Sequence, residues 1–173
     1  SALDTTFGAQ RHYAHEVAAY LEDDWTVNDK LKGNGGIHYS TFFVGDKQYS
    51  SLQPRLSFRY LIDQKSSFKM GYSKMGQFLH LLTNSGIGLP TDLWVPATEK
   101  IKPQFSDQIA AGYARTFNDK FEVSLEGYYK TMDNLIEYKD GASFFDNETD
   151  WQDKVHVGRG WSYGGELLVE KKN

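Results

Sequence analysis

The sequence contains no cysteine and only 4 prolines among its 173 residues. Without cysteine there is neither a disulfide framework nor a thiolate metal site. Lysine and arginine form no basic run, and a net charge of −4 argues against a nucleic-acid-binding domain, which normally carries a basic patch. No apolar run approaches the about 18 residues of a membrane-spanning helix. A mean hydropathy of −0.59 still permits a transmembrane β-barrel, whose strands alternate apolar and polar residues.

Aromatic residues, in contrast, are abundant: 11 tyrosines, 11 phenylalanines and 4 tryptophans. Aromatic side chains favour strands, so an all-β fold is expected. The clearest signal follows the polar turn at 118–120, where Phe121, Val123 and Leu125 alternate with polar residues. A period of two indicates a strand with one apolar and one wet face.

This alternating unit recurs along the chain. The strands are expected at 16–27, 31–44, 52–62, 67–77, 104–117, 121–135 and 155–170. They predict an antiparallel up-and-down meander of seven strands, each roughly 11–16 residues long, whereas soluble strands usually have about 5–6. Strands that cross a membrane need about 9–11 residues, so the predicted lengths favour a membrane barrel.

The links between these strands fall into two groups. Short polar turns are expected at 28–30, 63–65 and 118–120, and longer links at 45–51, 79–103 and 137–154. In a meander the two groups lie at opposite ends of the sheet, an asymmetry typical of outer-membrane barrels. The link at 79–103 has no period and is expected to be a loop, with one short helical turn at Leu79, Leu81 and Leu82.

Charged residues on the wet face, among them Lys32 and Glu166, indicate the size of the barrel. The candidates for lining its lumen are Arg55, Arg59, Lys69, Glu122 and Glu126. They do not fit the tight interior of a small eight-stranded barrel without extensive pairing. We therefore expect the chain to be a segment of a wider barrel.

Several motifs along the chain resemble TonB-dependent receptors, in particular those of the Bacteroides group. The motifs are EDDW at 22–25, LQPRLS at 52–57, LPTDLWVP at 89–96, PQFSDQ at 103–108, EGYYK at 126–130 and GGEL at 164–167. Each is weak alone, and their order is more specific. The resemblance extends from residue 16 to residue 170.

The resemblance implies an outer-membrane barrel of about 22 strands in a Gram-negative bacterium, with an N-terminal plug. Such a receptor imports a nutrient, for example a glycan or a siderophore, with energy transmitted by TonB. Residues 1–173 would then be a partial barrel domain that lacks the plug and the remaining strands. The implied partners are outer-membrane lipid, the TonB complex through the absent plug, a small-molecule or glycan substrate and a surface lipoprotein. No cofactor and no enzymatic activity are expected.

Aromatic residues in the long links are the candidates for ligand contact, because loops on a rigid scaffold commonly carry function. These candidates are Trp94, Tyr138, Phe144, Phe145 and Trp151. Packing of the loops on themselves is the alternative explanation for them. No metal site is expected, since the acidic stretch 146–150 lacks the glycine of a calcium-binding loop.

Two other functions remain open from the sequence. One is a soluble β-sandwich or barrel that binds a carbohydrate or a hydrophobic ligand. The other is a β-rich hydrolase that uses Glu122 and Glu126, which share a strand face in the manner of a glycosidase carboxylate pair.

Overall fold

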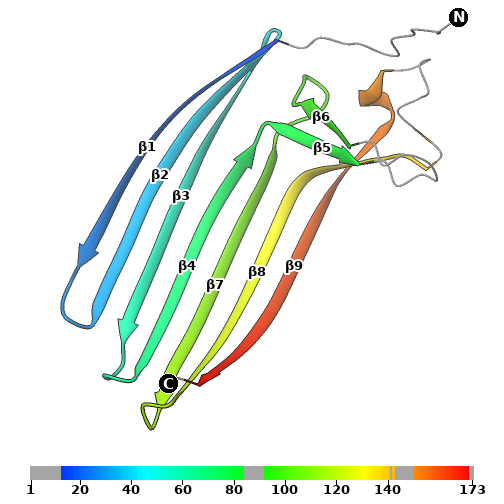
Figure 1. Ribbon diagram of the computed structural model, residues 1–173. Coiled ribbons are helices and arrows are strands. Elements are labelled where there is room, and N and C mark those ends of the chain that lie inside the picture. Colours follow the sequence, from blue (N-terminus) through cyan, green and yellow to red (C-terminus); the bar gives the residue numbers. More distant parts are fainter. Residues whose placement is uncertain (1–12, 84–91, 141, 143–149, 172–173) are drawn as a thin grey trace, which may run out of the picture.

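A computed structural model of the chain describes residues 13–83, 92–140, 142 and 150–171. Seven long strands form one antiparallel sheet in which neighbours in the chain are neighbours in space, except where two short strands intervene (Figure 1). The long strands are β1 (Ala14–Thr26), β2 (Leu31–Val44), β3 (Lys47–Leu61), β4 (Ser66–Gln77), β7 (Gln104–Phe117), β8 (Phe121–Tyr138) and β9 (Val155–Lys171). The predicted all-β meander of seven strands is confirmed.

The long link between β4 and β7 contains a hairpin of its own. β5 (Leu79–Thr83) pairs with β6 (Asp92–Pro96) in a separate two-stranded sheet. The helical turn expected at Leu79, Leu81 and Leu82 is wrong, because alternate residues of β5 are buried and exposed as pairing with β6 requires. The described residues include one short 3-10 helix, η1 (Trp151–Asp153), and no helix with the length and apolarity to cross a membrane.

Side chains and backbone angles close the short turns. The Asn28 side-chain oxygen accepts hydrogen bonds from the backbone N–H groups of Lys30 and Leu31, each at 2.9 Å. Between β7 and β8, Asn118 and Asp119 adopt positive φ angles of 50° and 55°. Asn and Asp tolerate this left-handed region, which the tight hairpin turn that fits strand twist requires at both central positions. The predicted polar turns are therefore confirmed.

The link between β2 and β3 is shorter than expected. Their pairing continues to Val44 opposite Lys47, so that only Gly45 and Asp46 form the turn. The predicted link at 45–51 is wrong because its polar residues after 46 continue the strand pattern of β3. Gly45, with a φ of +54°, supplies the left-handed residue. Of the three links at that end of the sheet, two are long and one is a tight turn.

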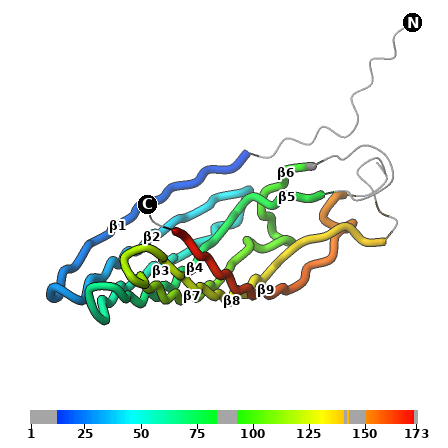
Figure 2. The backbone as a smooth tube through the Cα atoms, turned by 60° about the horizontal axis from the view of Figure 1, so that its bottom comes forward, coloured from blue at the N-terminus to red at the C-terminus, as the bar shows by residue number. Residues whose placement is uncertain are grey.

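The sheet has an apolar face and a polar face. On the apolar face, directly paired positions place Leu56, Tyr72, Ile109, Tyr129 and Tyr163 in one row across five strands. This face is open: Leu125 is 58% exposed and Tyr163 is 71% exposed. Seen from a second angle the sheet is a single curved layer, with β1 and β9 as its edge strands (Figure 2). It is not the two-layered sandwich that was one alternative.

Apolar side chains are buried where the long links meet the sheet. One cluster contains Phe42, Val44, Phe78 and Ala97, and the rings of Phe42 and Phe78 stack at 5.0 Å. A second cluster contains Leu82, Val95, Ile101 and Val155. Phe42 shares its side of β2 with Lys32 and Asn34 by strand alternation. The base of the β5–β6 hairpin thus packs against the polar face.

Candidate functional site

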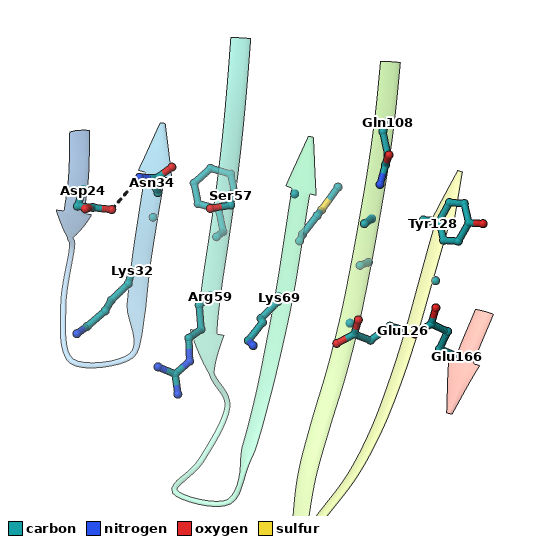
Figure 3. A pocket seen from close by; sticks show the side chains of 18 residues that line it. Asp24, Lys32, Asn34, Ser57, Arg59, Lys69, Gln108, Glu126, Tyr128 and Glu166 are labelled. Atoms are coloured by element: carbon teal, nitrogen blue, oxygen red, sulfur yellow. Dashed lines mark hydrogen bonds between the residues drawn. The ribbon is translucent and has the colours of Figure 1, made fainter. Parts of the chain in front are cut away.

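The polar face contains a hollow with a volume of about 530 Å³ near the short-turn end of the sheet. Side chains from β1, β2, β3, β4, β7, β8 and β9 line it (Figure 3). Protein sites for small ligands typically have volumes of about 300–1,000 Å³. The hollow is therefore of a size that a small molecule could occupy.

Charge is separated along one row of this hollow. Three cations on adjacent strands, Lys32, Arg59 and Lys69, lie directly opposite one another in the register of β2, β3 and β4. The same row continues through Gly112 on β7 to Glu126 on β8 and Glu166 on β9. A side chain at position 112 would meet Glu126, since an added Cβ would lie 3.2 Å from its Cγ. The glycine leaves the space across which the Glu126 side chain extends (Figure 3).

A polar contact joins two strands where their ladder ends. The β3–β4 pairing stops at Arg55 opposite Ser73. Beyond it, the buried Gln53 side chain accepts a hydrogen bond from the Gly76 backbone N–H at 3.0 Å. Its amide nitrogen donates to the Ser40 hydroxyl, also at 3.0 Å. Gln53 thus holds β2, β3 and β4 together on the polar side between the hollow and the hairpin.

The β5–β6 hairpin presents two different faces. On one face His80, Leu82 and Val95 are buried. On the other, Leu81 lies opposite Trp94, and these side chains are 40% and 59% exposed. The hairpin is fixed at its base by the Ala97 backbone N–H, which donates to the Phe78 carbonyl at 2.7 Å. Trp94 is therefore an exposed aromatic residue on a hairpin with a packed reverse face.

His80 is an unusual member of this core. Its side chain is fully buried, and neither ring nitrogen has a hydrogen-bond partner of good geometry, although the Lys102 backbone lies close to the ring. Burial lowers the pKa of His80 below its ordinary value of 6.5, since a charged imidazole would lose its hydration. Near neutral pH the ring is therefore uncharged and behaves as part of the apolar packing.

An ion pair and a side-chain hydrogen bond connect the two long links. Lys100 Nζ lies 2.8 Å from Asp153 Oδ1, which raises the pKa of Lys100 and lowers that of Asp153. The Thr98 hydroxyl donates to the Gln152 side-chain oxygen. The Tyr49 hydroxyl donates to the Thr98 carbonyl at 2.6 Å, so that β3 also holds this segment.

Sequence comparison identifies the family. The model of the family "TonB dependent receptor-like, beta-barrel" matches residues 3–170. The chain belongs to this family. A search of curated protein sequences finds no match to this receptor-family chain.

The fold of the receptor-family chain also matches a solved structure, the alcaligin outer membrane receptor FauA from Bordetella pertussis. The TM-score is 0.58 at 15% sequence identity, and the match covers 92% of this chain. The chain spans 27% of the length of FauA. At this identity the likeness establishes a common fold and no more.

The predicted lumen-lining residues of this receptor-family chain all lie on the polar face. Arg59, Lys69 and Glu126 line the hollow. Arg55, opposite Gly36 and Ser73, borders a second, smaller hollow beside it. Glu122 lies opposite Thr116 and Glu170, closer to the short turns. Whether these side chains line a transport lumen stays a prediction.

Those of the predicted ligand-binding aromatics that the structure describes do not form one group. Trp94 is exposed on the hairpin, whereas Tyr138 and Trp151 pack against the cluster of Leu82 and Val95. That packing accounts for Tyr138 and Trp151 in structural terms, and a role for them in ligand binding stays a prediction. Phe144 and Phe145 lie outside the described residues.

From the sequence, Lys32 is expected on the wet face but not in a row of cations, and Gln53 is not singled out. Lys32 completes the cation row, and its place could have been found by aligning the strands in register from the short turns. Gln53 and Ser51 are buried on the same side of β3, whereas Arg55, Ser57 and Arg59 further along that side are exposed, and no local signal distinguishes the two groups.

Proposed function

We propose that this chain is one part of a larger transmembrane barrel of about 22 strands, in a TonB-dependent receptor of the bacterial outer membrane. The observation that carries the proposal is the single sheet layer with an open apolar face and a charged, hollowed opposite face. A water-soluble domain would have to cover that apolar face, because exposed apolar patches of this extent normally mark contact with a partner or a membrane. In a membrane barrel, lipid covers the apolar face and the water of the lumen hydrates the charged face.

The apolar band on β9 has the dimension that a bilayer requires. On the apolar face of this strand, Arg159 and Lys171 bound a stretch that contains Trp161, Tyr163 and Leu167. At about 3.3 Å per residue this stretch is about 40 Å long, or about 30 Å tall at a tilt of about 40°. The hydrocarbon core of a bilayer is about 30 Å thick. An ion pair marks the border of this stretch at the long-link end of the sheet, where Arg159 Nε lies 3.0 Å from Asp133 Oδ1.

The two edges of the sheet support a larger assembly. Every residue of β1 is exposed, and β9 has no neighbour on its outer side within the described chain. An unpaired strand edge of this length is a site for pairing with further strands, and a barrel removes both edges by closure. The order of the family motifs supports a receptor of the Bacteroides type.

In this proposal the receptor imports a nutrient such as a glycan or a siderophore. The partners are outer-membrane lipid on the apolar face, the TonB complex through a plug domain, and a surface lipoprotein at the long-link end. Trp94, Tyr138, Phe144, Phe145 and Trp151 are the candidates for first contact with the nutrient. Arg55, Arg59, Lys69, Glu122 and Glu126 would line its path.

Cell fractionation tests this proposal. An antibody against this segment should detect a protein several times larger than 19.8 kDa in the outer-membrane fraction. Heating in detergent should shift its mobility on a gel, as unfolding of a barrel does. An inner-membrane protein and a periplasmic protein serve as fraction controls. A band near 19.8 kDa in the soluble fraction would refute the proposal.

A further inference from the structure

The cation row formed by Lys32, Arg59 and Lys69 is electrostatically unfavourable as it stands. Like charges directly opposite one another on neighbouring strands destabilise a sheet. Within the described part of the chain none of these three side chains forms an ion pair. Asp24 and Glu126 line the same hollow but form no ion pair with these side chains among the described residues. The described strands therefore hold three adjacent positive charges without a paired counter-charge.

The surroundings of the row restrict where a counter-charge could bind. Neighbouring strands are about 4.8 Å apart, so Lys32 and Lys69 are about 10 Å apart with Arg59 between them. Asp24 borders the hollow on the β1 side, and Glu126 and Glu166 border it on the far side of Gly112, so that carboxylates on both sides repel an anion. An anion in the hollow is thus confined to the side of β2, β3 and β4 (Figure 3).

The chemistry of the three side chains selects the class of anion. The Arg59 guanidinium can donate two parallel hydrogen bonds to a carboxylate or a phosphate, whereas the two lysines act as flanking point charges. A volume of about 530 Å³ suits a small solute better than a chain segment that would fill the whole face.

We propose that Lys32, Arg59 and Lys69 form a binding subsite for a small anionic solute that carries more than one carboxylate or phosphate group. The inference rests on the proposed function, since it makes the polar face part of the path that the nutrient follows. It narrows the nutrient to an anion, or to a nutrient with an anionic part. Trp94 and the other loop aromatics are not needed for this step.

The test measures anion binding to the intact purified receptor that contains this segment. Citrate serves as the carboxylate probe, tripolyphosphate as the phosphate probe and sucrose as the neutral control, each titrated calorimetrically at low ionic strength. The variants are Arg59→Gln, Arg59→Lys and Lys130→Gln. Lys130 is the matched control because it is a single cation on the same polar face, opposite Gln108 and Ser162, with no cationic neighbour in its row.

The expected result is binding of citrate or tripolyphosphate that Arg59→Gln weakens by about tenfold or more. Arg59→Lys should retain part of it, Lys130→Gln should leave it unchanged within about twofold, and raised salt should weaken it. The thermal stability of Arg59→Gln without anion should equal or exceed that of the parent protein, because one of three repelling charges is gone. That readout separates a ligand-binding residue from a structural one.

Two results would overturn the inference. One is the absence of anion binding together with a lower melting temperature of Arg59→Gln, which would mean that acidic residues elsewhere in the intact protein already neutralise the row. The other is equal anion binding by Arg59→Gln and the parent protein. Both are distinct from failure of the proposed function, which fractionation decides without any ligand.

Discussion

Replacement of Leu82 by alanine should release the β5–β6 hairpin while the large sheet stays folded. Leu82 is fully buried in the cluster with Val95, Ile101 and Val155. A buried Leu→Ala change costs about 2–5 kcal/mol, through lost burial and the cavity that remains. At about 3 kcal/mol the open form of the hairpin becomes about 150-fold more populated. Because β5 and β6 pair only with each other, this opening should be local.

Hydrogen–deuterium exchange of the intact receptor in detergent or in a lipid nanodisc measures this change. The amides of β5 and β6 should exchange about 150-fold faster in Leu82→Ala, whereas those of β7 and β8 should keep their protection. Leu81→Ala is the matched control: it is the adjacent leucine on the opposite, 40% exposed face, and should cost less than about 0.5 kcal/mol. Equal effects of the two substitutions, or equal loss of protection in β7 and β8, would refute the reasoning about the hairpin core.

Two further predictions concern single side chains. Burial lowers the pKa of His80 below 6.5, so the opened hairpin binds a proton more readily than the closed one. The protection of the hairpin amides should therefore fall as the pH decreases below about 6.5, and in His80→Leu it should not depend on pH in this range. If the pH dependence persists in His80→Leu, a group other than His80 causes it. Gly35→Ala would place a Cβ 2.3 Å from the Trp25 ring and should lower stability by about 1–3 kcal/mol, whereas at Gly71 the nearest atom is 3.7 Å away. Thermal unfolding in detergent should rank Gly35→Ala well below Gly71→Ala, and equal midpoints would show that the Trp25 ring moves freely.

The large sheet could be predicted from sequence because its information is local. The alternation along Phe121, Val123 and Leu125 determines which side chains share a face, and the period of two leaves little freedom. The polar turn at Asn118 and Asp119 fixes the register of β7 with β8. The short hairpin was missed, because Leu79, Leu81 and Leu82 form an apolar run too short to distinguish a strand from a helical turn.

The candidate site could be predicted only in part, since it depends on register across several strands. The polar face identified Arg59, Lys69 and Glu126 individually, but their arrangement in one charge-separated row depends on five pairings between neighbouring strands. The burial of Gln53 and His80 arises from contacts between segments distant in sequence. Nothing in the local pattern around either residue indicates that burial.

The points at which the hairpin segment leaves and rejoins the sheet determine how easily this segment can diverge in evolution. β4 and β7 pair up to Gln77 opposite Gln104, so the segment between them departs and returns at directly adjacent points. Its removal or replacement would leave the register of the sheet intact, because none of its described residues belongs to a ladder of the seven-stranded sheet. The segment 78–103 is thus an exchangeable module. Substitutions or insertions in it can create new recognition surfaces while the seven-stranded sheet stays the same.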